Sequence, residues 1–250
     1  MIQFDGVTLS LSGRVILSDI DLRIEPGQFV CLIGPSGSGK TSLLRLLAGL
    51  AKPDRGSVSI GGRLVGGPDR STALIFQDYG RALLPWRTAA GNISLALEAM
   101  GTPVAKRQPI IDRLLTTIGL KDHADKLPSQ LSGGMQQRLQ IARCLAQQPE
   151  VFLWDEPFGA LDAMTRQTLQ DEILRISHEK TTTSLFVTHD LEEALYLSDR
   201  IVALSANPGR ITQVIDVDLP RPRDQLLTRE HPRFGELRRK LFRIFGEMHG

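Results

Sequence analysis

Four short apolar runs mark the chain, and each ends at a glycine or is followed by a polar residue. They are FVCLIG from Phe29, ALIF from Ala73, VFLW from Val151 and SLFVT from Ser184. An uninterrupted apolar run of this length is typical of a strand that is buried on both faces of a parallel sheet. Helical patterns separate the runs, so the sequence predicts an α/β core with a largely parallel sheet.

Strands and tight turns dominate the first 76 residues. Apolar runs flank Pro26-Gly27 and Gly61-Gly62, and each dipeptide predicts a hairpin. After His189 the chain returns to strand patterns at RIVAL and ITQVIDV, with a turn at Asn207-Pro208-Gly209 between them. We therefore expect an antiparallel β subdomain beside the parallel sheet.

The pattern between Pro85 and Pro149 is helical, and no strand-like run interrupts it. The segment IIDRLLTTI places apolar residues on one helical stripe, and Gly119 follows it as a cap. The stretch from Phe234 to Phe245 is amphipathic.

These patterns predict a single domain over residues 1–250. Its core and β subdomain comprise residues 1–84 and 150–220. An inserted helical subdomain spans 85–149, and a C-terminal helical tail spans 221–250.

Composition excludes several classes of protein. The net charge is 30 minus 28, or +2, which by itself is too small to imply a nucleic-acid partner. No apolar run is long enough to span a bilayer, and the N-terminus lacks the layout of a signal peptide. Cys31 and Cys144 lie in unrelated apolar contexts, so we expect buried, reduced thiols and a cytosolic location.

The segment GPSGSGKT follows a buried strand and precedes the apolar helix SLLRLLAG, as the motif G-x-x-x-x-G-K-[ST] requires. Its glycines let backbone N–H groups surround a phosphate, and the helix N-terminus adds partial positive charge. Lys40 can reach the β- and γ-phosphates, and the Thr41 hydroxyl can ligate Mg²⁺. The expected phosphate contacts are Gly34, Pro35, Ser36, Gly37, Ser38, Gly39, Lys40, Thr41 and Ser42.

Polar residues follow three of the strand-like runs. Asp155 ends VFLW, where it can hold Mg²⁺, and Glu156 comes next. A carboxylate at this position can polarise the attacking water, which contributes roughly 10²–10⁴ in rate. Gln77 follows ALIF, and His189 follows SLFVT. Because the carboxyl ends of parallel strands meet at one edge, we expect all four to converge on one phosphate site. We assign catalysis to Lys40, Gln77, Glu156 and His189, and the metal to Thr41, Gln77 and Asp155.

A second glycine-rich segment, LSGGM, precedes the helical pattern MQQRLQIARCL. With GPSGSGKT, Gln77, DEP, GALD and THD in this order, nearly the whole chain resembles the nucleotide-binding subunit of an ATP-binding cassette (ABC) transporter. The resemblance implies a P-loop NTPase core, ATP as the nucleotide and Mg²⁺ as the metal.

The resemblance also implies a head-to-tail homodimer that holds each ATP between two chains. Ser132, Gly133 and Gly134 of LSGGM would bind the ATP held by the partner's phosphate loop, and Asp162 of GALD would lie at the same interface. Ser132 suits the role of N-cap, and the glycines allow close approach to phosphate.

One position departs from the family pattern. The family usually stacks an aromatic residue on adenine at the place taken here by Leu11, and VTLSLSGRV contains no aromatic residue. Base–aromatic stacking is worth roughly 1–3 kcal/mol in other settings. We therefore expect Leu11 to pack on the base with weaker ATP affinity or looser base selectivity.

Three strings, LLPWRT, ANPGRI and DLPRPRD, resemble importers of the nitrate, sulfonate and taurine group. This implies integral membrane permease subunits as partners and, indirectly, a periplasmic or extracellular solute-binding protein. It also implies a peripheral position on the cytoplasmic face of the cell (inner) membrane.

In the family, the region after Gln77 and the helical subdomain hold the coupling helix of the membrane subunit. Leu83, Leu84, Pro85 and Trp86 would then form an apolar docking patch, with a core position for Trp86 as the alternative.

Two other classes compete with the importer. Soluble ABC proteins that act on nucleic acid or ribosomes usually carry two cassettes or a long coiled coil, and exporter cassettes are normally fused to their membrane segment. We expect no nucleic-acid partner. The basic tail from Arg221 to Arg243 is either a solvated amphipathic helix or an attachment to an anionic membrane or nucleic acid.

Overall fold

The computed structural model describes residues 1–75, 82–159, 161–180 and 182–249. A six-stranded sheet with the order β10-β9-β3-β8-β7-β6 forms its centre. Neighbouring strands run parallel except β10, which is antiparallel to β9. These strands are β3 (Phe29–Ile33), β6 (Thr72–Ile75), β7 (Val151–Asp155), β8 (Thr183–Val187), β9 (Arg200–Leu204) and β10 (Ile211–Asp216). The predicted α/β core is confirmed: three of the apolar runs supply β3, β7 and β8, and residues Ala73–Ile75 of the fourth lie in β6.

Both faces of the central sheet are covered, as the continuous apolar runs predict. Val30 and Leu32 of β3 pack in a cluster with helix α1 (Lys40–Leu47) and the second sheet. Phe29, Cys31 and Ile33 of the same strand face the opposite cluster, which includes apolar residues of several later helices. Cys31 and Cys144 are both buried, free thiols, as expected.

The second sheet is antiparallel, with the order β2-β1-β4-β5. Its strands are β1 (Ile2–Leu11), β2 (Arg14–Ile24), β4 (Arg55–Ile60) and β5 (Arg63–Leu64). Gly61-Gly62 joins β4 and β5 as a hairpin, as predicted. The predicted hairpin at Pro26-Gly27 is wrong. The turn there carries the chain from β2 of this sheet to β3 of the central sheet, so the two apolar runs do not pair.

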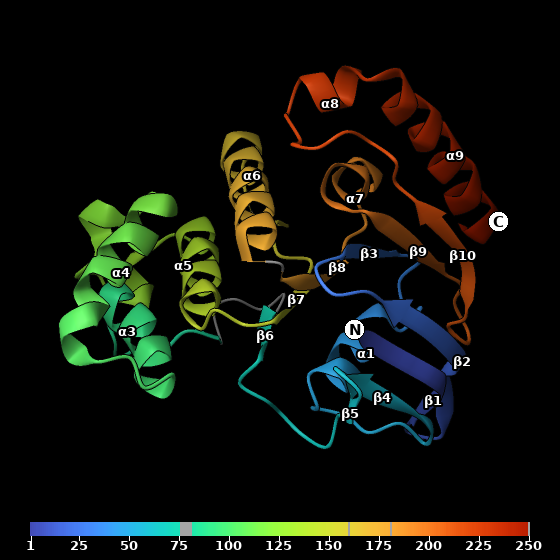
Figure 1. Ribbon diagram of the computed structural model, residues 1–250, viewed down its shortest axis with the longest axis horizontal. Coiled ribbons are helices and arrows are strands. Elements are labelled where there is room, and N and C mark those ends of the chain that lie inside the picture. The colour runs from blue at the N-terminus through green and yellow to red at the C-terminus, as the bar shows by residue number, and fades with distance from the viewer. Residues whose placement is uncertain (76–81, 160, 181, 250) are drawn as a thin grey trace.

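Helices α3 and α4 lie together at one end of the molecule, and α5 stands between them and the β6 edge of the central sheet (Figure 1). They span Ala89–Ala99, Val104–Thr117 and Gly133–Ala146, with short 3-10 turns η1 (Lys121–His123) and η2 (Pro128–Gln130). Gly119 has φ 65° just after α4, and its N–H donates to the carbonyl of Thr116 at 3.0 Å, so it is the expected cap. No strand lies between residues 85 and 149, all of which the structure describes.

Helix α6 (Ala163–Lys180) stands between this helical group and α7 (Leu191–Leu197) (Figure 1). The last two helices described are α8 (Leu227–Glu230) and α9 (Pro232–His249). Figure 1 shows α8 and α9 arching over α7. The predicted amphipathic stretch lies within α9, whose Phe234, Leu237, Leu241 and Ile244 are buried. Within the described ranges, no helix combines the length and hydropathy needed to cross a bilayer.

Candidate functional site

The loop between β3 and α1 curves so tightly that a side chain at either of two positions would be strained. Gly34 and Gly39 have positive φ angles of 153° and 86°. A Cβ on Gly34 would lie 2.5 Å from the carbonyl oxygen of Leu204, and one on Gly39 would lie 2.4 Å from Cδ2 of Leu17. The glycines of GPSGSGKT therefore fix the shape of this loop against β9 and β2.

Gly209, in the segment between β9 and β10, packs against the phosphate loop, a contact that the sequence did not predict. A Cβ on Gly209 would lie 2.2 Å from the carbonyl oxygen of Ser38. The Gly209 N–H donates to the carbonyl of Ile16 at 2.8 Å, and its carbonyl accepts from the N–H of Ser18 at 3.0 Å. The only signal in the sequence was a glycine in a predicted turn, which says nothing about what the turn touches.

The ammonium of Lys40 is held inside the curve of the loop. It donates to the carbonyls of Gly34 and Pro35 at 2.8 and 2.9 Å and lies 3.3 Å from the hydroxyl of Ser38. Burial lowers the pKa of Lys40, and the nearby carboxylates of Glu156 and Asp155 oppose that shift. The loop therefore concentrates a cation and the N-terminus of α1 at one point, which suits a phosphate.

Thr41, the second residue of α1, contacts the end of β7. Its hydroxyl lies 3.1 Å from a carboxylate oxygen of Asp155, which is 7% exposed. Burial raises the pKa of Asp155, the hydrogen bond from Thr41 opposes the shift, and Glu156 adds to it. A hydroxyl and a buried carboxylate are the hard oxygen donors that Mg²⁺ prefers, so this pair fits the predicted metal.

Glu156 directly follows β7 in an unusual backbone conformation. Its φ is 48°, which is uncommon outside glycine, and its N–H donates to the carbonyl of Val187 at 3.1 Å. Its carboxylate lies 3.4 Å from Nδ1 of His189, which follows β8. The His189 side chain is 71% exposed. The structure thus brings together three of the polar residues expected at the strand ends: Asp155, Glu156 and His189.

The LSGGM segment begins helix α5. The Ser132 hydroxyl accepts a hydrogen bond from the N–H of Met135, so it caps the helix as expected. Gln137, one turn further on, is buried and donates to the carbonyl of Pro157, beside Glu156. Among the described residues, no hydrogen bond joins Ser132, Gly133 or Gly134 to loop 34–39 of the same chain.

Asp162 caps the N-terminus of α6. A carboxylate oxygen accepts from the N–H of Thr165 at 3.0 Å, and this bond is the main cause of the lowered pKa of Asp162. The residue is exposed, as a contact with a second chain would require.

A family model described as ABC transporter matches residues 17–159, more than half of the chain. The chain belongs to the ABC transporter family. It is an ATP-hydrolysing cassette of that family.

Relatives in the ABC transporter family match over nearly the whole chain. It is 47% identical to the aliphatic sulfonates import ATP-binding protein SsuB 1 of Xanthomonas axonopodis pv. citri, over 88% of this chain and 89% of that protein. It is 46% identical to the nitrate import ATP-binding protein NrtC of Synechococcus elongatus, over 91% of this chain and 35% of that longer protein.

A solved ABC cassette shares the fold. It is the dimeric structure of a post-hydrolysis state of the ATP-binding cassette MJ0796 bound to ADP and Pi, which superposes with a TM-score of 0.77 at 30% identity. The match covers 87% of this chain and 99% of that one.

Leu11 and Gln77 are two further expected contacts of the ABC cassette. Leu11 is the last residue of β1, opposite Arg14 of β2, and it is 47% exposed. A half-exposed leucine at this strand end leaves an apolar surface on which a base can pack. Gln77, to which we assigned both catalysis and metal binding, lies outside the described residues.

The segment after Gln77 corrects part of the expected apolar patch. Leu83 is 3% exposed and belongs to the core, whereas Trp86 is 72% exposed, so the core alternative for Trp86 is wrong. The fully buried Asn92 holds the backbone that presents Trp86. Its side chain accepts from the N–H of Leu84 at 2.9 Å and donates to the carbonyls of Leu84 and Arg87 at 3.2 and 3.0 Å.

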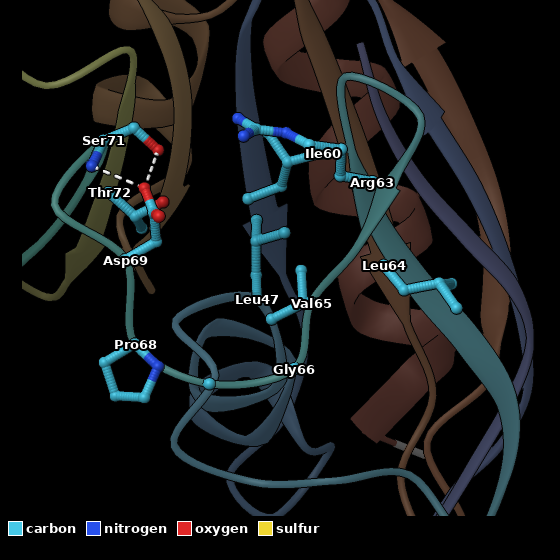
Figure 2. A pocket seen from close by; sticks show the side chains of 11 residues that line it. Leu47, Ile60, Arg63, Leu64, Val65, Gly66, Pro68, Asp69, Ser71 and Thr72 are labelled. Atoms are coloured by element: carbon cyan, nitrogen blue, oxygen red, sulfur yellow. Dashed lines mark hydrogen bonds between the residues drawn. The ribbon is translucent and has the colours of Figure 1, made fainter.

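A surface cavity of about 280 Å³ lies elsewhere, between the β4–β5 hairpin and the chain leading to β6. Figure 2 shows Leu47 and Val65 next to each other, with Asp69 on the segment to one side and Arg63 on the segment to the other. Asp69 accepts from the N–H of Ser71 at 2.8 Å. None of the residues that line this cavity belongs to the phosphate loop or to the strand ends described above.

Proposed function

We propose that this chain powers an importer of small anions such as nitrate, sulfonates or taurine. The observation that carries the proposal is the assembled hydrolysis site, with Thr41 against Asp155 and Glu156 against His189. The import subunits that match 88% or more of the chain support the transport direction and the class of solute.

In this proposal, the phosphate loop binds the triphosphate of ATP. The Lys40 ammonium exchanges the carbonyls of Gly34 and Pro35 for oxygens of the β- and γ-phosphates. Thr41 and Asp155 would hold Mg²⁺. When bound, that ion would neutralise charge that develops on the phosphates.

Glu156 and His189 act on the water and the γ-phosphate. The carboxylate of Glu156 takes a proton from the attacking water, a role worth roughly 10²–10⁴ in rate. His189 lies 3.4 Å from that carboxylate, so it can orient Glu156 and donate toward the γ-phosphate. Gln77 would contribute to both catalysis and Mg²⁺ binding, as proposed from the sequence.

ATP is shared between two copies of the chain. Ser132, Gly133 and Gly134 carry backbone N–H groups at the start of α5, a geometry that binds phosphate. No charged side chain is needed there, because the partner's loop supplies Lys40. Asp162 would lie beside the same interface.

The partners in the membrane are permease subunits, and the chain would sit against the inner face of the membrane. Residues 85–149 would move as a helical subdomain relative to the core of residues 1–84 and 150–220. Trp86 is the exposed apolar contact for the permease, because Asn92 fixes the backbone around it.

Trp86→Ala tests this function in the assembled transporter. We expect unchanged ATP hydrolysis by the purified subunit, but loss of co-purification with integral membrane proteins and of solute uptake. Leu64→Ala is the matched control, since Leu64 is 73% exposed on β5. Normal uptake by the Trp86 variant would remove the docking role, and co-purification of the native chain with ribosomes or nucleic acid would overturn the importer itself.

A further inference from the structure

The C-terminal segment from Arg221 to Arg238, named here the C-terminal brace, is bound tightly to the rest of the chain. The guanidinium of Arg221 lies 2.6 Å from the carboxylate of Asp199, and that of Arg223 donates to the carbonyl of Ser198 at 3.0 Å. The basic side chains at the start of the tail thus make hydrogen bonds and an ion pair within the same chain. They are not available as a free patch for an anionic surface.

Gln225 connects the brace to α6. Its amide nitrogen donates to the Asp171 carboxylate at 2.7 Å and to the side-chain oxygen of Gln170 at 3.3 Å. Its amide oxygen accepts from the guanidinium of Arg229 at 3.4 Å.

The brace also contacts α7 at Glu192. Arg229 and Arg238 lie 3.0 and 2.9 Å from the two carboxylate oxygens of Glu192. Arg229 stacks over the ring of Tyr196, 5.3 Å from its centroid. The first turn of α7 is therefore clamped by two arginines of the brace.

A buried carboxylate continues the path from α6. Glu193 is 5% exposed and Gln170 is 1% exposed. The amide nitrogen of Gln170 donates to one oxygen of Glu193 at 3.0 Å, and the Thr188 hydroxyl donates to the other at 2.5 Å. A buried carboxylate needs such donors, because leaving its oxygens unpaired is costly.

The donors in this path all point the same way. They run from Arg229 to Gln225, to Gln170 and to Glu193, so a cation stands at one end and a carboxylate at the other. Each amide can satisfy both neighbours in one orientation only, because its oxygen accepts and its nitrogen donates. Such a chain polarises cooperatively in a buried setting.

The hydrogen-bond path reaches Thr188 and Asp190, the residues on either side of His189. The Thr188 hydroxyl, bound to Glu193, also accepts from the N–H of Asp190 at 3.0 Å. The Asp190 carboxylate in turn accepts from the N–H groups of Glu192 and Glu193 at 2.9 and 3.1 Å. The residues before and after the exposed histidine are therefore both fixed to α7.

We propose that the C-terminal brace positions His189 for ATP hydrolysis through Gln225, Gln170 and Glu193. Glu193 and Gln170 are positioning residues, since neither is placed against ATP. The path crosses α6, the helix that Asp162 caps. The brace therefore fixes the position of α6 as well as that of the segment that carries His189. This inference rests on the role proposed for His189.

A double-mutant cycle on the full chain tests the path. Gln170→Glu places a second carboxylate against Glu193, and Glu193→Gln removes the charge that orients the amide. We expect each to lower kcat about tenfold, which corresponds to about 1.4 kcal/mol in the barrier. The KM for ATP should change less than about twofold, because the phosphate loop is untouched.

In the double variant, the amide at position 193 can donate to the carboxylate at position 170 and still accept from Thr188. We therefore expect kcat to recover to within about threefold of the parent chain, a non-additivity that marks direct contact. A kcat of the double variant no higher than that of the less active single variant would overturn the path.

Two further variants test whether Gln225 contributes to hydrolysis through this path. Gln225→Ala should lower kcat about threefold with KM unchanged, since one hydrogen bond of the path is lost. Leu227→Ala is the neighbouring control, because Leu227 is 72% exposed, and it should leave kcat unchanged. A loss of thermal stability without any change in kcat for Gln225→Ala would show a purely structural tail and overturn the brace.

His189→Ala distinguishes failure of the brace from failure of the site. Loss of hydrolysis in that variant, with full kcat in both Gln225→Ala and Gln170→Glu, would overturn the brace and leave the role of His189 standing. Full hydrolysis in His189→Ala would overturn the role of the histidine and, with it, the brace.

Discussion

The hydroxyl of Thr41 lies 3.1 Å from a carboxylate oxygen of Asp155, although 114 positions separate the two residues. Thr41 stands in the first turn of α1 and Asp155 ends β7, so the contact joins the phosphate loop to the carboxyl edge of the sheet. It fixes a hydroxyl and a carboxylate at the spacing that a small divalent cation can bridge.

Asp155→Asn should stabilise the nucleotide-free chain while abolishing Mg²⁺-dependent hydrolysis. Burial raises the pKa of Asp155, so the folded state binds its proton more tightly than the unfolded state does. The free energy of unfolding therefore falls as pH rises through the interval between the two pKa values. The asparagine variant escapes this loss, and a gain of about 1 kcal/mol would raise its Tm by about 2–4 °C.

Calorimetry at neutral and acidic pH checks this expectation. The difference in Tm should shrink as the pH falls, because the native carboxyl then takes up its proton. Asp122→Asn is the control, since Asp122 is exposed on η1. A lower Tm for Asp155→Asn at neutral pH would contradict the argument.

Glu156→Gln should bind Mg-ATP and accumulate as a closed dimer. The amide keeps the shape of the side chain but cannot accept the proton of the attacking water, so kcat should fall by roughly 10²–10⁴. Size-exclusion chromatography with Mg-ATP and a phosphate-release assay measure the two effects. Glu230→Gln, an isosteric change at an exposed position of α8, controls for the loss of charge. Full turnover by Glu156→Gln would exclude Glu156 as the base.

Leu11→Tyr should tighten ATP binding. Leu11 is 47% exposed at the end of β1, and an aromatic ring there can stack on the adenine. Stacking is worth roughly 1–3 kcal/mol per base, or about 5- to 150-fold in Kd. Calorimetric titration with ATP measures it, and Val104→Tyr on α4, 76% exposed in the native chain, is the control. Unchanged affinity would mean that Leu11 does not contact the base.

Local motifs made much of this site predictable from the sequence. The phosphate loop needs only one strand, one turn and one helix that are contiguous in the chain, so GPSGSGKT specifies them together. Asp155, Glu156 and His189 could be predicted because each stands at or just beyond the end of a buried strand, and parallel strands end at a common edge.

Contacts between distant segments were not predictable in the same way. Gly209 meets the carbonyl of Ser38 across 171 positions, and Pro26-Gly27 marks a turn without showing which sheet each strand joins. The sequence placed Leu83 in a surface patch, because an apolar residue gives no sign in the sequence of whether it is buried or exposed. Gln225 carried no signal at all, since a glutamine in a polar tail shows its role only through its partners.

Mixing two inactive variants tests whether each ATP lies between two chains. Lys40→Ala removes the cation that holds the phosphates, and Ser132→Arg blocks the start of α5, so each variant alone should lack hydrolysis. In a mixed dimer, the intact loop of the Ser132 variant faces the intact LSGGM segment of the Lys40 variant. A two-fold dimer has two equivalent sites, so an equal mixture should regain about a quarter of the native rate if the sites act independently.

The same mixture distinguishes the opposite arrangement. If LSGGM served the phosphate loop of its own chain, every site in the mixture would carry one defect and no activity would return. The control is an equal mixture of Lys40→Ala with Glu156→Gln. Both of these lesions lie on the phosphate-loop side of the site, so their mixed dimers contain no intact site and should stay inactive. Recovery in the first mixture without recovery in the control would place Ser132 against the triphosphate bound by the partner chain, whereas inactivity of both would remove the shared site.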